Sequence, residues 1–330
     1  MTTAPSESGG AGGADRPRAA IDPSRAAALG LLPDRIAFLG FGLIGGSIAL
    51  ALRAAGSTAH LAAWTPAGTG PRAGLERGVL DAAPATAEEA LRDATLVILA
   101  SPPMAVIRGL EELSGPLRAA LAPDVTISDV ASTKGLVVAR AEDLGLPFVG
   151  GHPMAGRESS GFEAATADLF VDRPWVVVAA EGATSRDVAR VEALARAVGA
   201  RPIAMAASAH DMAVARISHL PLVAAAALVE SVVGDADQWR DARALAASGW
   251  RDMTRLARGD AEMGGGILAT NASAIADAIR TYRDALDAWL VELERLEDEA
   301  APAMPTAEAA EPLRAKLAAA RALLESEPRS

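Results

Sequence analysis

The sequence predicts an α/β fold in which a doubly wound, Rossmann-type N-terminal domain is followed by an all-helical C-terminal domain. Short apolar runs alternate with helical stretches up to about residue 206, and a glycine-rich motif follows the first run. After Ser208 the strand patterns stop, and Ala/Leu-rich helical periodicity continues to Leu324. Continuous apolar strands separated by helices are typical of a parallel sheet that is covered on both faces.

The boundaries of these elements follow from the same patterns. The predicted strands span residues 35–40, 60–64, 95–100, 125–130, 147–151, 175–180 and 201–206. The helical pattern is strongest over 44–55, 208–233, 260–297 and 307–324. Residues 1–33 are rich in Gly, Ala, Ser and Pro, and we expect a disordered tail without a signal peptide. The predicted domains are therefore a dinucleotide-binding domain over 34–207 and a helical substrate and dimerisation domain over 208–330.

Composition limits the classes of partner. The chain is 51% hydrophobic and 22% charged, with a formal net charge of −11, so we expect neither nucleic acid nor an anionic membrane as a partner. The uncharged run over 36–52 contains several glycines and falls short of the roughly 20 apolar residues that a membrane span needs. The absence of cysteine excludes disulfides and thiolate chemistry and fits a cytoplasmic location.

A phosphate-binding motif follows the first predicted strand. Gly40, Gly42 and Gly45 form a G-x-G-x-x-G pattern that opens a predicted helix, with Leu43 and Ile44 between the last two glycines. Such glycines allow a tight turn and a close approach of backbone N–H groups to a pyrophosphate, and the helix N-terminus favours that anion. The alternative is a glycine-rich packing turn, but the strand–turn–helix context favours dinucleotide binding.

The end of the second predicted strand bears on the choice of dinucleotide. An NAD site usually places Asp or Glu there to bind the ribose 2′-hydroxyl, whereas this strand is followed by Thr65 and carries no carboxylate. Thr65 can hydrogen-bond a 2′-phosphate, and Arg72 lies nearby in sequence. The cofactor is therefore predicted to be NADP or NAD, with NADP favoured. Ser101, after the third strand, is a further predicted cofactor-binding residue.

Three of the four histidines stand in unusual settings. His152 comes just past a predicted strand end, where ligands bind in open α/β sheets. His210 and His219 share one helical stretch, which Pro221 is expected to kink. No third ligand stands at a suitable spacing from this pair, so no metal site is predicted. Five short motifs occur in order: GLIGGS (42–47), SDVASTKG (128–135), GGHPMAGRESSGFEAA (150–165), SHLP (218–221) and WRDMTRLA (250–257).

These motifs resemble those of the prephenate/arogenate dehydrogenase family of tyrosine biosynthesis, over about residues 34–300. The resemblance implies oxidative decarboxylation of a cyclohexadienol, with hydride transfer to NAD(P). Under it, His152 accepts the proton of the ring hydroxyl, Ser132 orients that hydroxyl, and Arg255 clamps a substrate carboxylate. The remaining predicted substrate-binding residues are Ser218, His219 and Arg251.

Structural roles compete with several of these assignments. Ser132 can instead cap a helix, Arg255 can pair with a neighbouring carboxylate, and His219 can belong to the core. His210 with Asp211 is interpreted as structural. Prephenate-specific relatives often carry a second histidine directly after SHLP, where this chain has Leu222, so the choice between prephenate and arogenate stays open.

Two other functions compete with this assignment. One is a different Rossmann-plus-helical dehydrogenase that acts on β-hydroxyacids, which requires a lysine on a helix of the second domain. This chain has only Lys134, in the nucleotide domain, and Lys316, near the C-terminus. The other is a non-catalytic dinucleotide sensor, which needs no ordered His, Ser and Arg. The alanine-rich helical part predicts a homodimer, because it cannot build a thick core alone.

Overall fold

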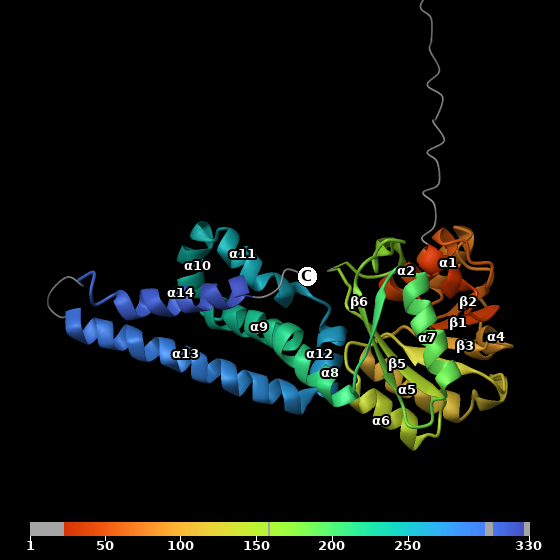
Figure 1. The fold of residues 1–330 in the computed structure, drawn as a ribbon. Helices are drawn as coiled ribbons and strands as arrows, with labels where there is room; N and C mark the ends of the chain where they lie inside the picture. Colours follow the sequence, from red (N-terminus) through yellow and green to blue (C-terminus); the bar gives the residue numbers. More distant parts are fainter. Residues whose placement is uncertain (1–22, 158, 301–305, 327–330) are drawn as a thin grey trace, which may run out of the picture.

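The computed structural model describes residues 23–157, 159–300 and 306–326, which form an α/β part and an elongated helical part (Figure 1). The strands are β1 (Arg35–Leu39), β2 (His60–Trp64), β3 (Leu96–Leu99), β4 (Thr126–Asp129), β5 (Phe148–Pro153), β6 (Pro174–Ala179) and β7 (Arg201–Ala204). They form one sheet in the order β2-β1-β3-β4-β5-β6-β7. The doubly wound arrangement predicted from the sequence is confirmed.

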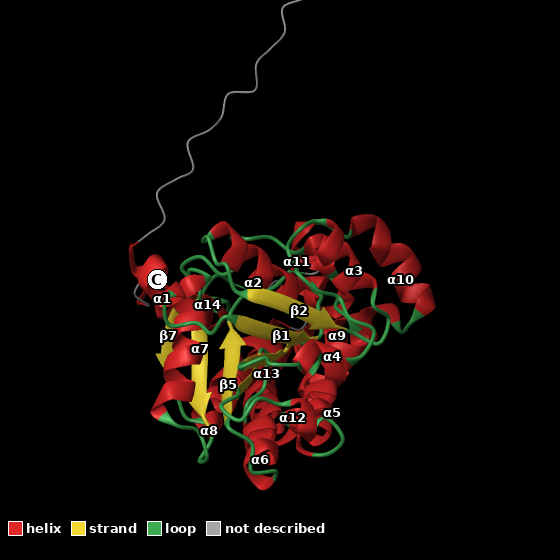
Figure 2. Cartoon of the chain, turned by 90° about the vertical axis from the view of Figure 1, so that its right-hand side faces the viewer, coloured by secondary structure: helices red, strands yellow, loops and turns green. Residues whose placement is uncertain are grey.

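Helices cover both faces of the sheet (Figure 2). In this part the helices are α1 (Pro23–Leu29), α2 (Leu43–Ala54), α3 (Thr69–Glu76), α4 (Ala87–Leu91), α5 (Pro103–Ser114), α6 (Gly135–Asp143) and α7 (Ser185–Ala197), with 3-10 turns η1 (Arg118–Ala120) and η2 (Phe162–Ala164). One core cluster joins α1, α2 and α7 to the sheet through residues such as Phe38 and Ile48. The other joins α4, α5 and α6 to the opposite face through residues such as Val97 and Ile127.

The sheet is not parallel throughout, which corrects the expectation of a parallel sheet. β6 runs antiparallel to β5, and His152 pairs with Val176 across them. The chain between the two strands contains only loops and η2, so it enters β6 from the edge at which β5 ended, without the crossover that a parallel pair needs. This pairing extends β5 to Pro153. His152 therefore lies within the strand and not just past its end.

The predicted tail over 1–33 is wrong for its described part. Residues 23–29 form α1, which packs against α7. Ala28 is buried in the core, and Arg25 donates from Nε to the carbonyl oxygen of Ala197 at 3.1 Å. This helix was missed because a single apolar alanine stretch beside polar residues carries no clear periodicity. Residues 1–22 lie outside the described residues.

The helical part follows β7 and extends away from the sheet (Figure 1). Its elements are α8 (Ala207–Val214), the π-helical turn η3 (Ala215–His219), α9 (Leu220–Val233), α10 (Ala236–Ala242), η4 (Arg243–Leu245), α11 (Ser248–Thr254), η5 (Arg255–Arg258), α12 (Ala261–Thr270), α13 (Ala272–Ala300) and α14 (Glu311–Ser326). The predicted helix over 260–297 is broken at Asn271, whose φ of −132° departs from helical geometry.

Much of the apolar surface of the helical part is exposed in the single chain. The span Ala207–Val233 is long and apolar enough to cross a membrane by length and composition, and only 22% of its most apolar window is buried. The same span carries His210, Asp211 and His219, which are buried polar side chains. The polar side chains of this span are therefore buried within the chain, whereas most of its apolar surface is left for contact with something other than the single chain.

Candidate active site

A pair of buried histidines lies where the sheet meets the helical part. His152 on β5 and His210 on α8 place Nδ1 and Nε2, respectively, 2.8 Å apart. Their rings meet edge to face, with centroids 5.0 Å apart. Burial, reinforced by the nearby cationic Lys134, holds the pKa of His152 well below its ordinary value. His152 is therefore neutral at neutral pH, as a general base must be.

The second nitrogen of His210 is bound by a carboxylate. Nδ1 of His210 lies 2.7 Å from Oδ1 of Asp211, and the Asp211 carboxylate accepts backbone N–H bonds from Lys134 at 2.8 Å and from Gly135 at 2.7 Å. Burial alone raises the pKa of Asp211, but the hydrogen bonds from His210 and from these two backbone groups bring it below its usual value. Asp211 is thus an ionised residue of the helical part that caps α6 of the α/β part.

A buried ion pair lies beside this network. Nζ of Lys134 contacts Oδ2 of Asp129, and both side chains are fully buried. Oδ1 of Asp129 accepts the backbone N–H of Gly151 at 3.0 Å, and Oδ2 accepts that of Ala131 at 2.9 Å. These bonds hold the ends of β4 and β5 together directly next to His152. Burial lowers the pKa of Lys134, while the carboxylate of Asp129 opposes that shift.

His219 presents a buried nitrogen that no described residue binds. Its Nδ1 faces Nδ2 of Asn271 at 3.3 Å, and Asn271 also donates to the carbonyl oxygen of Asp211 at 2.8 Å. An amide NH₂ only donates, so Nδ1 of His219 accepts and its proton lies on Nε2. Within the described chain, Nε2 is buried without a hydrogen-bond partner. Such a donor is costly unless a ligand or water satisfies it.

The position of His219 at the end of the π-helical turn η3 also favours a role for this residue in ligand binding. Such turns are rare and occur often at functional sites. Burial lowers the pKa of His219 to about 4, so the ring is neutral at neutral pH.

The glycine-rich turn has the shape of a dinucleotide cradle. Gly40 follows β1 with φ of +101°, and a Cβ placed on it would lie 2.4 Å from the carbonyl oxygen of Ala100 and 2.5 Å from Oγ of Ser101. Gly45 would likewise place a Cβ 3.0 Å from the carbonyl oxygen of Gly40, whereas Gly42 faces open space except for Gly161 at 4.0 Å. The first N–H groups of α2 point out of the helix with no side-chain cap, so the turn fits a pyrophosphate.

The end of β2 carries a hydroxyl and no carboxylate. Oγ1 of Thr65 accepts the backbone N–H of Gly68 at 3.0 Å, and Nε of Arg72 donates to the carbonyl oxygen of Gly68 at 3.3 Å. Both side chains are thus tied to the backbone of the same loop residue, Gly68. This arrangement places a hydroxyl and a cation in the region where an adenosine ribose binds in such folds.

Comparisons with known proteins agree with this geometry. Residues 48–204 match the family described as prephenate dehydrogenase, nucleotide-binding domain, and residues 206–302 match prephenate dehydrogenase, dimerization domain. The chain belongs to the prephenate dehydrogenase family.

Individual members of the family show the same relationship along most of the chain. The prephenate dehydrogenase of Bacillus subtilis is 31% identical over 80% of this chain and 70% of its own length. Among solved structures, a Synechocystis arogenate dehydrogenase is 31% identical with a TM-score of 0.65, covering 81% of this chain and 97% of its own. The Aquifex aeolicus prephenate dehydrogenase, in complex with hydroxyphenyl propionate and NAD+, is 26% identical with a TM-score of 0.74, covering 88% and 98%.

The other predicted site residues of this prephenate dehydrogenase family member lie in several places. Ser132 is half-buried in the turn between β4 and α6, at the same sheet edge as His152. Asp211 binds the first N–H groups of α6, so the capping role considered for Ser132 is filled by another residue. Ser218 lies in η3 and is exposed.

The two predicted substrate-binding arginines are exposed in the single chain. α11 ends at Thr254 and Arg255 begins the 3-10 turn η5, so Arg251 and Arg255 lie in different helical elements. η5 packs against α9. The structure therefore brings His152 and His219 to the buried network with His210, but it leaves both arginines at the surface.

Sequence reasoning missed three members of the network. His210 and Asp211 were interpreted as structural, and Asn271 was read as part of a continuous helix. The contact between His152 and His210 joins residues 58 positions apart, and no local periodicity encodes it. One signal was available, since SAHD places an imidazole next to a carboxylate in an otherwise apolar helix.

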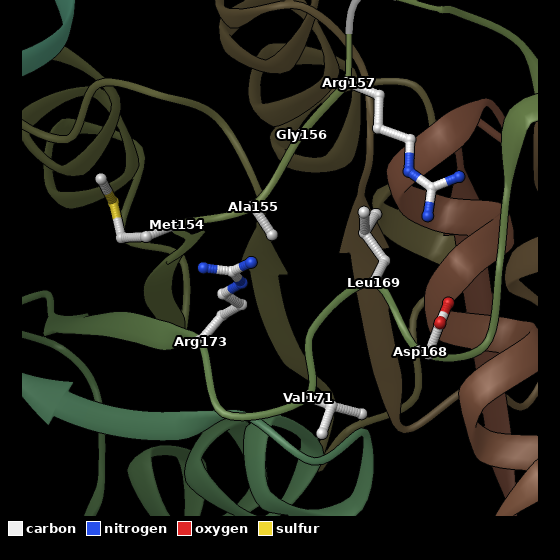
Figure 3. Close-up of a pocket in the computed structure, with 8 residues that line it drawn as sticks. All are labelled: Met154, Ala155, Gly156, Arg157, Asp168, Leu169, Val171 and Arg173. Carbon is white, nitrogen blue, oxygen red and sulfur yellow. The ribbon is translucent and has the colours of Figure 1, made fainter. Parts of the chain in front are cut away.

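An open hollow of about 440 Å³ lies beyond the end of β5 (Figure 3). It is lined by Met154, Ala155, Gly156, Arg157, Asp168, Leu169, Val171 and Arg173. The side chains of Arg157 and Arg173 approach it from two sides, and Nη2 of Arg157 donates to Oγ1 of Thr166 at 3.2 Å. None of the predicted site residues lines this hollow, and neither do His210 and Asp211. Among the residues that the structure describes, no cluster of His, Asp and Glu could hold a metal ion.

Proposed function

We propose that this chain catalyses the oxidative decarboxylation of prephenate or arogenate in tyrosine biosynthesis, with hydride transfer to NAD+ or NADP+. The observation that carries the proposal is the buried, neutral His152 at the sheet edge that also holds the dinucleotide cradle. β1, β3, β4 and β5 are parallel, so Gly40, Ser101, Ser132 and His152 follow or end strands at one edge. Ligands of open α/β sheets bind at that edge.

The proton of the substrate hydroxyl moves to and from His152. Nδ1 faces His210, so Nε2 is the ring nitrogen that takes the proton while the carbinol becomes a carbonyl. When bound at the glycine-rich turn, the nicotinamide dinucleotide would supply the acceptor for the hydride of the carbinol carbon. Loss of the ring carboxylate as CO₂ leaves a phenolate, and His152 returns the proton to its oxygen. The base is neutral again after each turnover, so the buried site needs no proton exit.

The remaining side chains are assigned to holding the substrate. Ser132 orients the reacting hydroxyl from the turn after β4. The unpartnered Nε2–H of His219 donates to an acceptor on the substrate, and Ser218 stands beside it in sequence. Arg255 clamps a carboxylate, since a guanidinium matches it with two parallel hydrogen bonds, and Arg251 assists.

For the cofactor we propose a preference for NADP over NAD. Thr65 follows β2 directly and Arg72 binds the same loop at Gly68, and the end of this strand carries no carboxylate that would repel a 2′-phosphate. A hydroxyl and a guanidinium both donate hydrogen bonds to phosphate oxygens.

The assembled state we propose is a cytoplasmic homodimer built on the helical part. The matched dimerization domain covers residues 206–302, and α13 carries apolar side chains that are about half exposed in the single chain. These are Leu286, Leu290, Val291 and Leu293. A second copy covers such a surface more readily than lipid does, because the apolar span over α8 and α9 also carries buried charged and polar groups. A single-chain mass by light scattering at micromolar concentration would contradict the dimer.

Steady-state kinetics test the activity. The purified chain is assayed with prephenate and with arogenate, each with NAD+ and with NADP+, by following the absorbance of the reduced cofactor and identifying the aromatic product. We expect turnover with at least one substrate and a higher kcat/KM with NADP+. Cofactor binding without turnover of either substrate would refute the proposed dehydrogenase activity and would favour a dinucleotide sensor.

A further inference from the structure

We propose that Asp211 and His210 are positioning residues that fix the tautomer of His152 and thereby make its Nε2 the base. This inference rests on the proposed function, since it concerns how the base of that reaction is set. Its three members come from both parts of the chain, because His152 lies on β5 while His210 and Asp211 lie on α8.

The direction of each hydrogen bond follows from the carboxylate. Asp211 accepts two backbone N–H bonds and is ionised, so it can only accept from Nδ1 of His210, which therefore carries a proton. Neutral His210 then has a lone pair on Nε2. That lone pair accepts from Nδ1–H of His152 at 2.8 Å. The proton of neutral His152 is thus placed on Nδ1, and its Nε2 carries the lone pair that a base needs.

The same chain of bonds stabilises the imidazolium that forms during turnover. When Nε2 of His152 takes a proton, the hydrogen bond from its Nδ1–H to His210 strengthens. The Asp211 carboxylate, which is two hydrogen bonds away through His210, supplies the opposite charge. Lys134 is the cation that opposes this protonation, and its pairing with Asp129 limits that opposition. His219 also faces the network, through Asn271, and is neutral.

A purely structural role for the hydrogen bond between His152 and His210 predicts different effects of substitution. If His210 served only to join the two parts of the chain, any buried hydrogen bond between them would serve equally well. The hydroxyls of Thr133 and Thr270 form such a bond at 2.8 Å, buried and outside the histidine network. Thr270→Val therefore provides a matched control, because it removes a buried contact between the parts and leaves His152 and His210 untouched.

Long-range ¹H–¹⁵N spectra of the imidazole rings test the tautomers without any ligand. The chain has four histidines, so the spectrum is simple, and single substitutions assign each ring. We expect His152 and His210 to carry their protons on Nδ1 and His219 to carry its proton on Nε2. A His152 that carries its proton on Nε2 in the wild-type protein would overturn the inference.

Kinetics of His210 variants test the consequence for turnover. His210→Leu removes the acceptor for Nδ1–H of His152, and we expect kcat to fall by about 10²-fold while KM changes less than about threefold. The acidic limb of the kcat profile should move to lower pH, because the imidazolium loses its stabilising acceptor. His210→Gln keeps an amide that can donate to Asp211 and accept from His152, and it should recover kcat to within about tenfold of wild type.

The outcomes separate this inference from the proposed function. If the wild-type chain turns over neither prephenate nor arogenate, the proposed function fails. The spectra still test the tautomers of His152 and His210 in that case, because they require no substrate. If the wild type is active and His210→Leu keeps its kcat and its pH profile, the inference is wrong and the function stands. An equal change in pH profile with Thr270→Val would show that joining the two parts accounts for the effect, which would also overturn it.

Discussion

Nδ1 of His152 lies 2.8 Å from Nε2 of His210, and this contact joins strand β5 to helix α8. Only 9% of His152 and 1% of His210 is exposed, so the bond forms in a site from which bulk water is largely excluded. Electrostatic interactions are stronger there than in water. The same low polarity makes each unpaired polar or charged group costly.

The ion pair between Lys134 and Asp129 should be essential to stability. Lys134→Met leaves a fully buried carboxylate without its cation, and we expect the free energy of unfolding to fall by about 3–5 kcal/mol. Urea denaturation measures this loss. Adding Asp129→Asn removes the stranded charge, so the double variant should lose less than the sum of the two single changes. A loss below about 1 kcal/mol in Lys134→Met would contradict the arrangement.

The stability of the protein should depend on pH through His219. Its pKa in the folded state is about 4, below the ordinary value of 6.5, so between these values the unfolded chain binds more protons. The contribution of neutral His219 is complete above about pH 6.5 and is lost as pH falls towards 4. The difference in unfolding free energy between wild type and His219→Gln should therefore be constant above pH 6.5 and shrink below it. A difference that does not vary between pH 4 and 6.5 would argue against a buried neutral ring.

Gly40 should be intolerant of any side chain. Gly40→Ala places a Cβ 2.4 Å from the carbonyl oxygen of Ala100 at a positive φ, which we expect to displace the turn and weaken cofactor binding by at least tenfold. Gly78→Ala is the matched control, since Gly78 has a φ of +66° but open space around its Cβ position. It should cost about 1–2 kcal/mol of stability and leave affinity unchanged. Fluorescence titration with the reduced cofactor gives both affinities. Equal affinity in the two variants would contradict the assignment of the turn at Gly40 to dinucleotide binding.

Thr65 should set the preference between the two dinucleotides. Thr65→Glu places at the end of β2 the carboxylate that binds a ribose 2′-hydroxyl and repels a 2′-phosphate. We expect the ratio of kcat/KM for NADP+ to that for NAD+ to fall by at least tenfold. Thr65→Val removes the hydroxyl without adding charge and should change this ratio much less. An unchanged ratio in Thr65→Glu would place the adenosine ribose elsewhere.

The sequence predicted those parts of the fold that local patterns encode. All seven predicted strands match the observed ones to within two residues at each end, because each is a short apolar run. The extension of β5 to Pro153 was not predicted, since it depends on pairing with β6, which lies more than 20 residues further along the chain. The break at Asn271 was hidden by apolar periodicity on both sides of it.

The candidate site likewise contains residues that local motifs predict and residues that only long-range contacts identify. The glycine turn and His152 stand in motifs with characteristic spacing, and they lie at the sheet edge where such motifs are expected. The roles of His210 and Asp211 depend on a contact between distant segments, which only the folded chain reveals. Arg251 and Arg255 are exposed in the single chain, so their assignment to the substrate depends on the family resemblance and not on geometry.

The most direct measurement compares His152→Asn with wild type in cofactor affinity and in turnover. Asparagine keeps a polar side chain near Nδ1 but has no basic nitrogen in place of Nε2, so we expect the cofactor Kd to stay within about threefold and kcat to fall by about 10²–10⁴-fold. A variant that binds the cofactor and turns over substrate at a rate close to wild type would contradict the account, because the proton would then have another acceptor.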